Sequence, residues 1–132
     1  MRHLWRIYLE KTNRFLREAE IDIKYGCYLK AISASYFAIE HMLKALIIRE
    51  FGSFPTKIGP LFSLADKLFV RKITSEKELR EYRDLMIIAR EIYNHRKNVD
   101  HLDYIPKRNE AEETLENTKL IINKLQLLLK RA

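Results

Sequence analysis

The residues whose types could carry chemistry are concentrated in one stretch, 90–104, which reads REIYNHRKNVDHLDY. It contains two arginine–histidine pairs with four residues between the partners, Arg90 with His95 and Arg96 with His101. Arginine binds phosphate through its bidentate fork, and histidine moves protons near neutral pH. Metal-free RNA cleavage needs only a cation that binds the scissile phosphate and a group that titrates near neutrality to transfer the proton.

The two arginines differ in their predicted surroundings. Arg96 follows Tyr93 by three residues and continues its apolar helix face, so we expect it to point inward or at a partner. A desolvated cation needs a compensating anion, and Asp100, four residues further on, could supply it. Arg90 and His95 lie off that face, and we expect both to be solvated.

Helix geometry favours the second pair. Residues five apart on a straight helix point about 140° away from each other, so an arginine and a histidine at this spacing converge only if the helix ends between them. Pro106 predicts a loop over residues 98–108, which supplies that break for Arg96 and His101 alone. The spacing leaves a structural alternative open, in which Arg96 and Asp100 form a buried ion pair that closes the fold and His101 caps the loop.

Other chemistry lacks support in the sequence. No nucleotide-binding glycine motif, H-E-x-x-H or Cys-x-x-Cys occurs, so we expect no cofactor and no metal. Cys27 is expected to be a buried structural cysteine. His41 is expected to be a packing or surface histidine, and Glu40 with Lys44 to form an ion pair on the helix surface.

Length and composition bound the class of protein. With 132 residues the chain has room for one domain, 1–132, and it carries only three Gly and three Pro, which favours helices. One cysteine fits a reducing cytoplasm. The net charge of +7 suits a polyanionic partner such as RNA, DNA or an anionic membrane, and a soluble surface that happens to be basic explains it about equally well. Charged residues interrupt the long apolar segments, so we expect no membrane association.

Apolar spacings of three and four residues predict an all-α fold, an antiparallel up-and-down bundle of four long helices plus one short helix. The long helices are expected at 3–25, 28–50, from Ser75 as N-cap to residue 97, and 109–130, with Asn109 as a cap. A loop at 51–60 precedes the short helix, 61–70. Four residues of the last helix lie outside its inner stripe and could cover a partner: Leu120, Ile121, Leu127 and Leu128.

The chain resembles the HEPN domain family over nearly its whole length. The resemblance is carried by the second predicted helix, YGCYLKAISASYFAIEHMLKALIIREFG, with its small residues, its Tyr-Phe pair and its EHMLKAL stretch. The segment RKNVDHLDY, which begins at Arg96, is similar to the family's arginine-to-histidine motif and to its R-x-x-x-D-Y variant.

The resemblance implies a helical bundle that forms a homodimer, with two motifs facing each other across one cleft. Active members are metal-independent ribonucleases and are often toxins controlled by a nucleotidyltransferase antitoxin. Carried over to this chain, Arg96 would bind the scissile phosphate and His101 would act as general acid or base. Asn98, Asp100 and Tyr104 would be supporting polar or structural residues, and the products would be a 2′,3′-cyclic phosphate and a 5′-hydroxyl.

The resemblance also implies an alternative, because inactive HEPN members serve as interaction modules that bind a nucleotidyltransferase or nucleic acid. Two departures from the common motif keep it open: Lys97 directly follows the arginine, and Tyr104 lies three residues after His101. Arg90 with His95 stays the alternative pair for a catalytic site.

Overall fold

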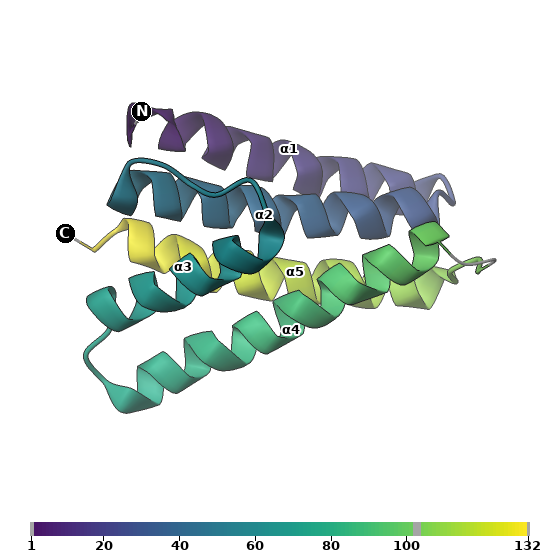
Figure 1. Cartoon of the computed structure of the whole chain (residues 1–132). Helices are drawn as coiled ribbons and strands as arrows, with labels where there is room; N and C mark the ends of the chain where they lie inside the picture. The colour runs from purple at the N-terminus through teal and green to yellow at the C-terminus, as the bar shows by residue number, and fades with distance from the viewer. Residues whose placement is uncertain (1, 102–103, 132) are drawn as a thin grey trace.

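The computed structural model describes the backbone of residues 2–101 and 104–131 and the side chains of residues 3–99 and 104–131. Over this part of the chain there are five α-helices and no β-strand, after one 3₁₀ turn at Arg2–Leu4. The helices are α1 (Trp5–Lys24), α2 (Tyr28–Phe51), α3 (Ile58–Lys72), α4 (Glu76–His101) and α5 (Arg108–Leu129). The prediction of an all-α bundle with four long helices and one short one is confirmed, α3 being the short one (Figure 1).

Helix α2 lies at the centre of the bundle and contacts each of the other four α-helices. Its first half is slim because Ala31, Ala34, Ser35 and Ala38 are buried, so neighbouring backbones approach it closely there. Larger side chains follow and build the main core with α3, α4 and α5. A smaller core cluster fills the end of the bundle where α1 turns into α2.

By length and composition α2 could cross a membrane, contrary to the expectation that charged residues interrupt such segments. In this fold 72% of its apolar window is buried inside the protein. The apolar character of α2 is therefore that of a core helix, typical of a soluble protein.

Glycines end the first two helices. Gly26 has a φ of 77° and Gly52 a φ of 86°, a left-handed conformation in which a side chain would be strained. The amide of Gly52 donates to the carbonyl of Ile48 at 2.9 Å and closes the last turn of α2. The predicted stop after residue 25 is confirmed, and α1 and α2 form an antiparallel hairpin (Figure 1).

Helix α4 begins as predicted and ends later than predicted. The Ser75 hydroxyl accepts a hydrogen bond from the Glu78 amide at 3.3 Å, as an N-cap does. At the other end the helix continues to His101, so the expectation of a loop from residue 98 is wrong. Val99 explains the difference, because it is buried in the smaller core cluster beside Ile32 and anchors a further turn.

Helix α5 differs from its prediction at its start and along one face. It begins at Arg108 with Lys107 as the extended residue before it, so Asn109 is not the cap. The Lys107 amide donates to the Glu110 carboxylate at 3.4 Å, which satisfies one of the open amides at this end. Ile121 and Leu128 are buried within the bundle, because α5 packs against both α2 and α4.

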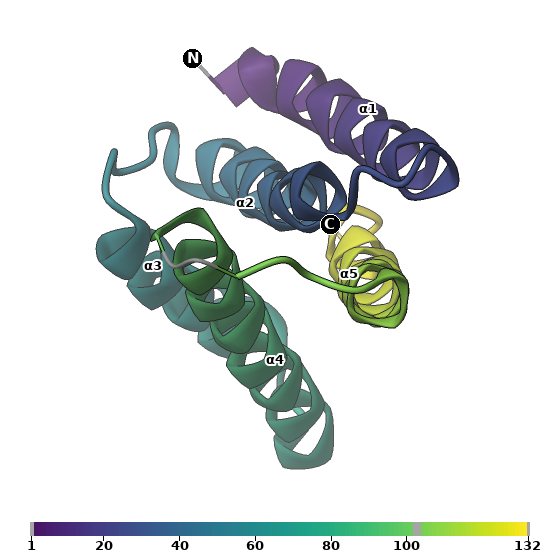
Figure 2. The same ribbon diagram turned by 90° about the vertical axis from the view of Figure 1, so that its right-hand side faces the viewer.

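The connections that follow α2 bring the end of α4 and the start of α5 together. The C-terminal end of α4 and the start of α5 lie at the same end of the bundle as the α1–α2 connection (Figure 1). Seen from the side, α3 and α4 lie next to each other and away from α1 (Figure 2). The candidate motif on α4 therefore lies where four of the five helices meet.

Candidate functional site

Arg96 lies on the side of α4 that faces α2, where its guanidinium covers two adjacent aromatic rings. The guanidinium carbon lies 4.6 Å from the ring centre of Phe37 and 5.5 Å from that of Tyr36. The negative face of an aromatic ring attracts a cation, and the attraction strengthens where water is partly excluded. The prediction that Arg96 points inward from α4 is confirmed, and its position is fixed by two rings of the central helix.

The two rings beneath Arg96 are themselves held in place. The Tyr36 hydroxyl donates to the Glu40 carboxylate at 3.2 Å, and the Tyr36 ring contacts that of Tyr93 at 5.2 Å between centres. Burial, followed by the nearby Glu40 charge, raises the pKa of Tyr36 far above its ordinary value, so its hydroxyl stays protonated. Phe37 packs against Phe15 of α1. Sequence reasoning noted the Tyr-Phe pair but did not assign it this supporting role.

Positions 96 and 101 lie on one uninterrupted helix. Since α4 includes His101, no helix end separates the two positions, and they are about 140° apart around the helix axis. The geometric reason for preferring this pair over Arg90 and His95 is therefore wrong. The side chains of Asp100 and His101 lie outside the described residues, so the Arg96–Asp100 ion pair and the Arg96–His101 pair both remain predictions.

Arg90 is bound to α3. Its guanidinium forms an ion pair with Asp66 at 3.2 Å and lies over the Phe62 ring at 4.9 Å from its centre. The expectation that Arg90 is solvated holds in part, because its side chain is 41% exposed while its guanidinium also contacts α3. Asp66 comes from another helix, so no spacing within the 90–104 stretch could have revealed this ion pair.

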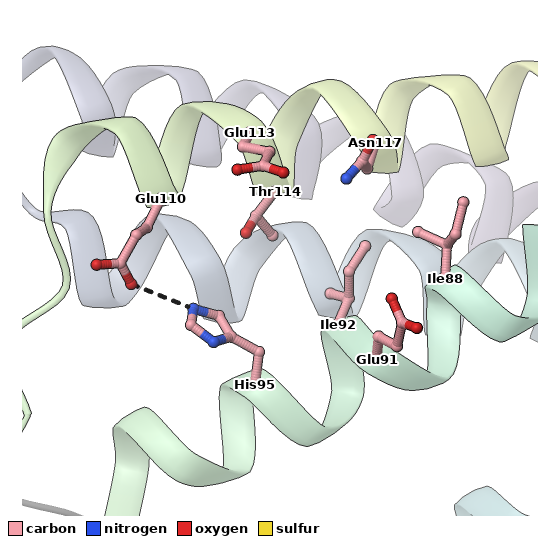
Figure 3. Close-up of a pocket in the computed structure, with 8 residues that line it drawn as sticks. All are labelled: Ile88, Glu91, Ile92, His95, Glu110, Glu113, Thr114 and Asn117. Carbon is pink, nitrogen blue, oxygen red and sulfur yellow. Dashed lines mark ion pairs between the residues drawn. The ribbon is translucent and has the colours of Figure 1, made fainter.

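His95 points the other way, toward α5. Its Nε2 lies 3.7 Å from Glu110 Oε2 (Figure 3). Its ring also meets the Tyr104 ring edge to face. The Tyr104 hydroxyl donates to the same Glu110 carboxylate, which is the main cause that lowers the pKa of Glu110. Arg90 contacts α3 while His95 contacts α5, so the structure does not bring the alternative pair together within one chain.

The pocket beside His95 carries negative charge. It has a volume of about 200 Å³ and lies between α4 and α5. Three carboxylates line it, those of Glu91, Glu110 and Glu113, with Ile88 and Ile92 at its apolar side (Figure 3). A site of this charge repels a phosphate group, so it does not suit the predicted chemistry.

The remaining single candidates have structural surroundings. Cys27 is exposed at the N-cap position of α2, so its expected burial is wrong, because the turn at Gly26 carries it outside the core. His41 is a packing histidine as predicted, and its Nδ1–H donates to the Phe37 carbonyl at 2.7 Å. The predicted Glu40–Lys44 ion pair is confirmed at 3.6 Å.

Asn98 is exposed on the last turns of α4, and Tyr104 is exposed beside Glu110. Within the described residues no three His, Cys, Asp or Glu side chains are grouped as metal ligands would be. The site that the structure places most firmly therefore consists of Arg96 with Tyr36 and Phe37.

Comparison with protein families bears out the resemblance seen in the sequence. The family model of the HEPN domain matches residues 5–128, nearly the whole chain. A search of curated proteins found no match.

Proposed function

Because the chain belongs to the HEPN domain family, we propose that it is a metal-independent endoribonuclease. The family places the protein among RNA-related nucleases or interaction modules. The observation that carries the finer proposal is Arg96, whose guanidinium is held over Phe37 and Tyr36 in the motif at the end of α4. An arginine positioned in advance can stabilise the charge of a phosphate without reorganising during the reaction.

In the proposed reaction Arg96 binds two nonbridging oxygens of the scissile phosphate. His101 takes the proton of the ribose 2′-hydroxyl, and the 2′-oxygen attacks phosphorus. The bond between phosphorus and the 5′-oxygen breaks, and that oxygen takes a proton from a general acid, which in a composite site is His101 of the second copy. The products are a 2′,3′-cyclic phosphate and a 5′-hydroxyl, and Asn98 is a polar neighbour that could hold the substrate.

A homodimer would bring an arginine and a histidine from two copies of the chain into one site. The straight course of α4 places positions 96 and 101 on different sides of the helix, which supports a composite site built from two copies. In such a dimer the two motifs face each other across one cleft, and the net charge of +7 attracts RNA to it. We further propose a toxin role in the cytoplasm, restrained by a nucleotidyltransferase antitoxin.

A second candidate function, that of a noncatalytic interaction module, is favoured by α5. Leu120 and Leu127 are seven residues apart on one face of that helix, and they are 61% and 44% exposed. This stripe is the part of the predicted second face that the bundle leaves uncovered, and it suits the apolar face of a partner protein.

The test is cleavage of end-labelled RNA in EDTA by the wild type, Arg96→Ala, Arg96→Lys and His101→Ala. Arg90→Ala is the matched control, because Arg90 is an arginine on the same helix that also covers an aromatic ring. We expect Arg96→Ala and His101→Ala to lose about a hundredfold or more in rate. Arg96→Lys keeps the charge but loses the bidentate fork, so it should also be impaired.

Folding is checked by circular dichroism and dimerisation by light scattering for each variant. Products that carry a 2′,3′-cyclic phosphate would support the proposed reaction. If the folded wild type cuts none of several RNA types, or if Arg96→Ala and Arg90→Ala cut equally well, the nuclease proposal fails and the interaction module is favoured.

A further inference from the structure

The two exposed edges of α4 carry opposite charges. On the edge toward α3 lie Arg83, Arg90 and Lys97, whose spacing of seven residues keeps them on one side of the helix. Around the helix from them, toward α5, lie Glu81, which pairs with Lys124 of α5, and Glu91. Glu91 lines the acidic pocket that Figure 3 shows. This separation of charge predicts that a polyanion meets α4 from the side of α3.

Helix α3 adds cations to the same edge. Lys67 and Arg71 of α3 and Arg83 of α4 line one groove of about 460 Å³. Asp66 also lines it, and its carboxylate is paired with Arg90 at 3.2 Å, so the net charge of the groove stays positive. Arg71 is engaged, since it pairs with Glu50 at 3.5 Å and covers the Phe51 ring. Over the described part of the chain, neither Lys67 nor Arg83 forms an ion pair with a carboxylate.

The groove between the two helices also offers apolar surface. Phe51 and Val70 line it, and Val70 is 57% exposed. Ile87, 53% exposed, lies four residues beyond Arg83 on the same edge of α4. Cations beside apolar surface match a strand that carries phosphates and bases, because an unstacked base can bury its face where the phosphates are neutralised.

From this arrangement we propose that the α3–α4 edge, formed by Lys67, Arg71, Arg83 and Lys97, binds the backbone of single-stranded RNA and leads it toward Arg96. Arg83 and Lys97 are 14 positions apart, about 21 Å along the helix, so the edge spans several nucleotides. Lys97 directly precedes the last turn of α4, and the edge thus ends beside the motif. The inference rests on the proposed function for its substrate, but it concerns binding and not cleavage.

Binding is measured by fluorescence anisotropy with a labelled RNA whose 2′-hydroxyls are methylated, since that probe cannot be cut by attack of the 2′-oxygen. The test variant is Lys67→Glu with Arg83→Glu. The matched control is Arg17→Glu with Lys30→Glu, two exposed cations on α1 and α2 whose replacement changes the net charge by the same amount. We expect the test variant to bind about tenfold more weakly or worse, and the control to stay within about twofold of the wild type.

The salt dependence of binding identifies the contacts. Each phosphate contact on a single strand adds about 0.7 to the slope of log affinity against log salt concentration, so Lys67→Gln with Arg83→Gln should lower that slope by about 1.4. Inorganic polyphosphate and polyglutamate serve as competitors. RNA should displace the probe better than either at equal charge, because only RNA has bases for the groove.

Several results would overturn the inference: no binding of the probe by the wild type, an equal loss of affinity in the test and control variants, or equal displacement by polyglutamate or polyphosphate. Cleavage of unmodified RNA separates this inference from the proposed function. If RNA binding depends on Lys67 and Arg83 but no RNA is cut, the nuclease proposal fails and the edge stands. If Arg96 is needed for cleavage but the test variant binds like the wild type, the edge is refuted and the nuclease stands.

Discussion

Arg90 and Arg96 lie on the same helix, less than two turns apart, and each covers an aromatic ring of a neighbouring helix. The seam at Arg90 joins α4 to α3, with Phe62 beneath the guanidinium and Asp66 as its ion-pair partner. At Arg96 the seam joins α4 to α2, with Phe37 and Tyr36 beneath the guanidinium. Both arginines have the same spacing to a histidine, so that spacing does not distinguish them. The comparison shows that the helix each arginine faces determines its role.

Replacing the ring beneath Arg90 should have the largest effect on stability. Phe62 is 4% exposed, and Phe62→Ala should lower the free energy of unfolding by about 3–5 kcal/mol, from lost burial and the cavity left behind. Urea denaturation measures this loss. Cleavage per folded molecule should stay near the wild-type rate, and a loss as large as that of Arg96→Ala would break the distinction between the two seams.

Replacing the ring beneath Arg96 should reverse that pattern. Phe37→Leu keeps an apolar side chain, so the free energy of unfolding should fall by only about 1–2 kcal/mol. RNA cleavage should fall by about tenfold or more, because the face that positions the guanidinium is gone. Phe15→Leu is the control, since Phe15 is an aromatic residue of α1 whose ring packs against Phe37. Equal cleavage by the two variants would contradict a positioning role for Phe37.

The ion pair at the α3 seam should contribute less. Both side chains are about two-fifths exposed, so solvent screens the pair, and Arg90→Gln should lower the free energy of unfolding by about 1 kcal/mol or less. Asp66→Asn should have a similar effect, and the double variant should be scarcely worse than either single one. Additive losses in this double-mutant cycle would show that the two groups stabilise the fold independently.

The smallest expected effect is the pH dependence of stability that comes from His41, which lies in the aromatic group around Phe37. Burial lowers the pKa of His41, with the nearby Lys44 and Lys11 charges adding to the shift. The unfolded chain therefore binds a proton more readily than the folded one. The contribution of His41 to the free energy of unfolding should be fully present above the ordinary pKa of about 6.5, and it should be lost as pH drops below that value. In His41→Gln this part of the pH dependence should be absent when denaturation is followed across the range.

Periodicity predicted the five helices because each buries one continuous stripe in its own sequence, and it predicted that Arg96 points inward because the stripe through Tyr93 includes it. It failed at the end of α4, where one apolar residue, Val99, packs against α2 and extends the helix beyond the expected loop. The partners of Arg90 and His95 lie on α3 and α5, so local spacing carried no information about them. Pairing between helices is a tertiary property, and only the fold reveals it.

Because α2 lies at the centre of the bundle, the order in which the helices are synthesised determines when each of its faces is covered. During synthesis α2 emerges after α1 and before the other three helices that cover it, and the short turn at Gly26 lets α1 and α2 pack at once through local contacts. The faces of α2 that meet α3, α4 and α5 stay uncovered until those helices follow. A nascent chain that has not yet produced α4 therefore lacks the helix that brings Tyr93 and Arg96 over the Tyr36 ring, although Phe37 already packs against Phe15 of α1.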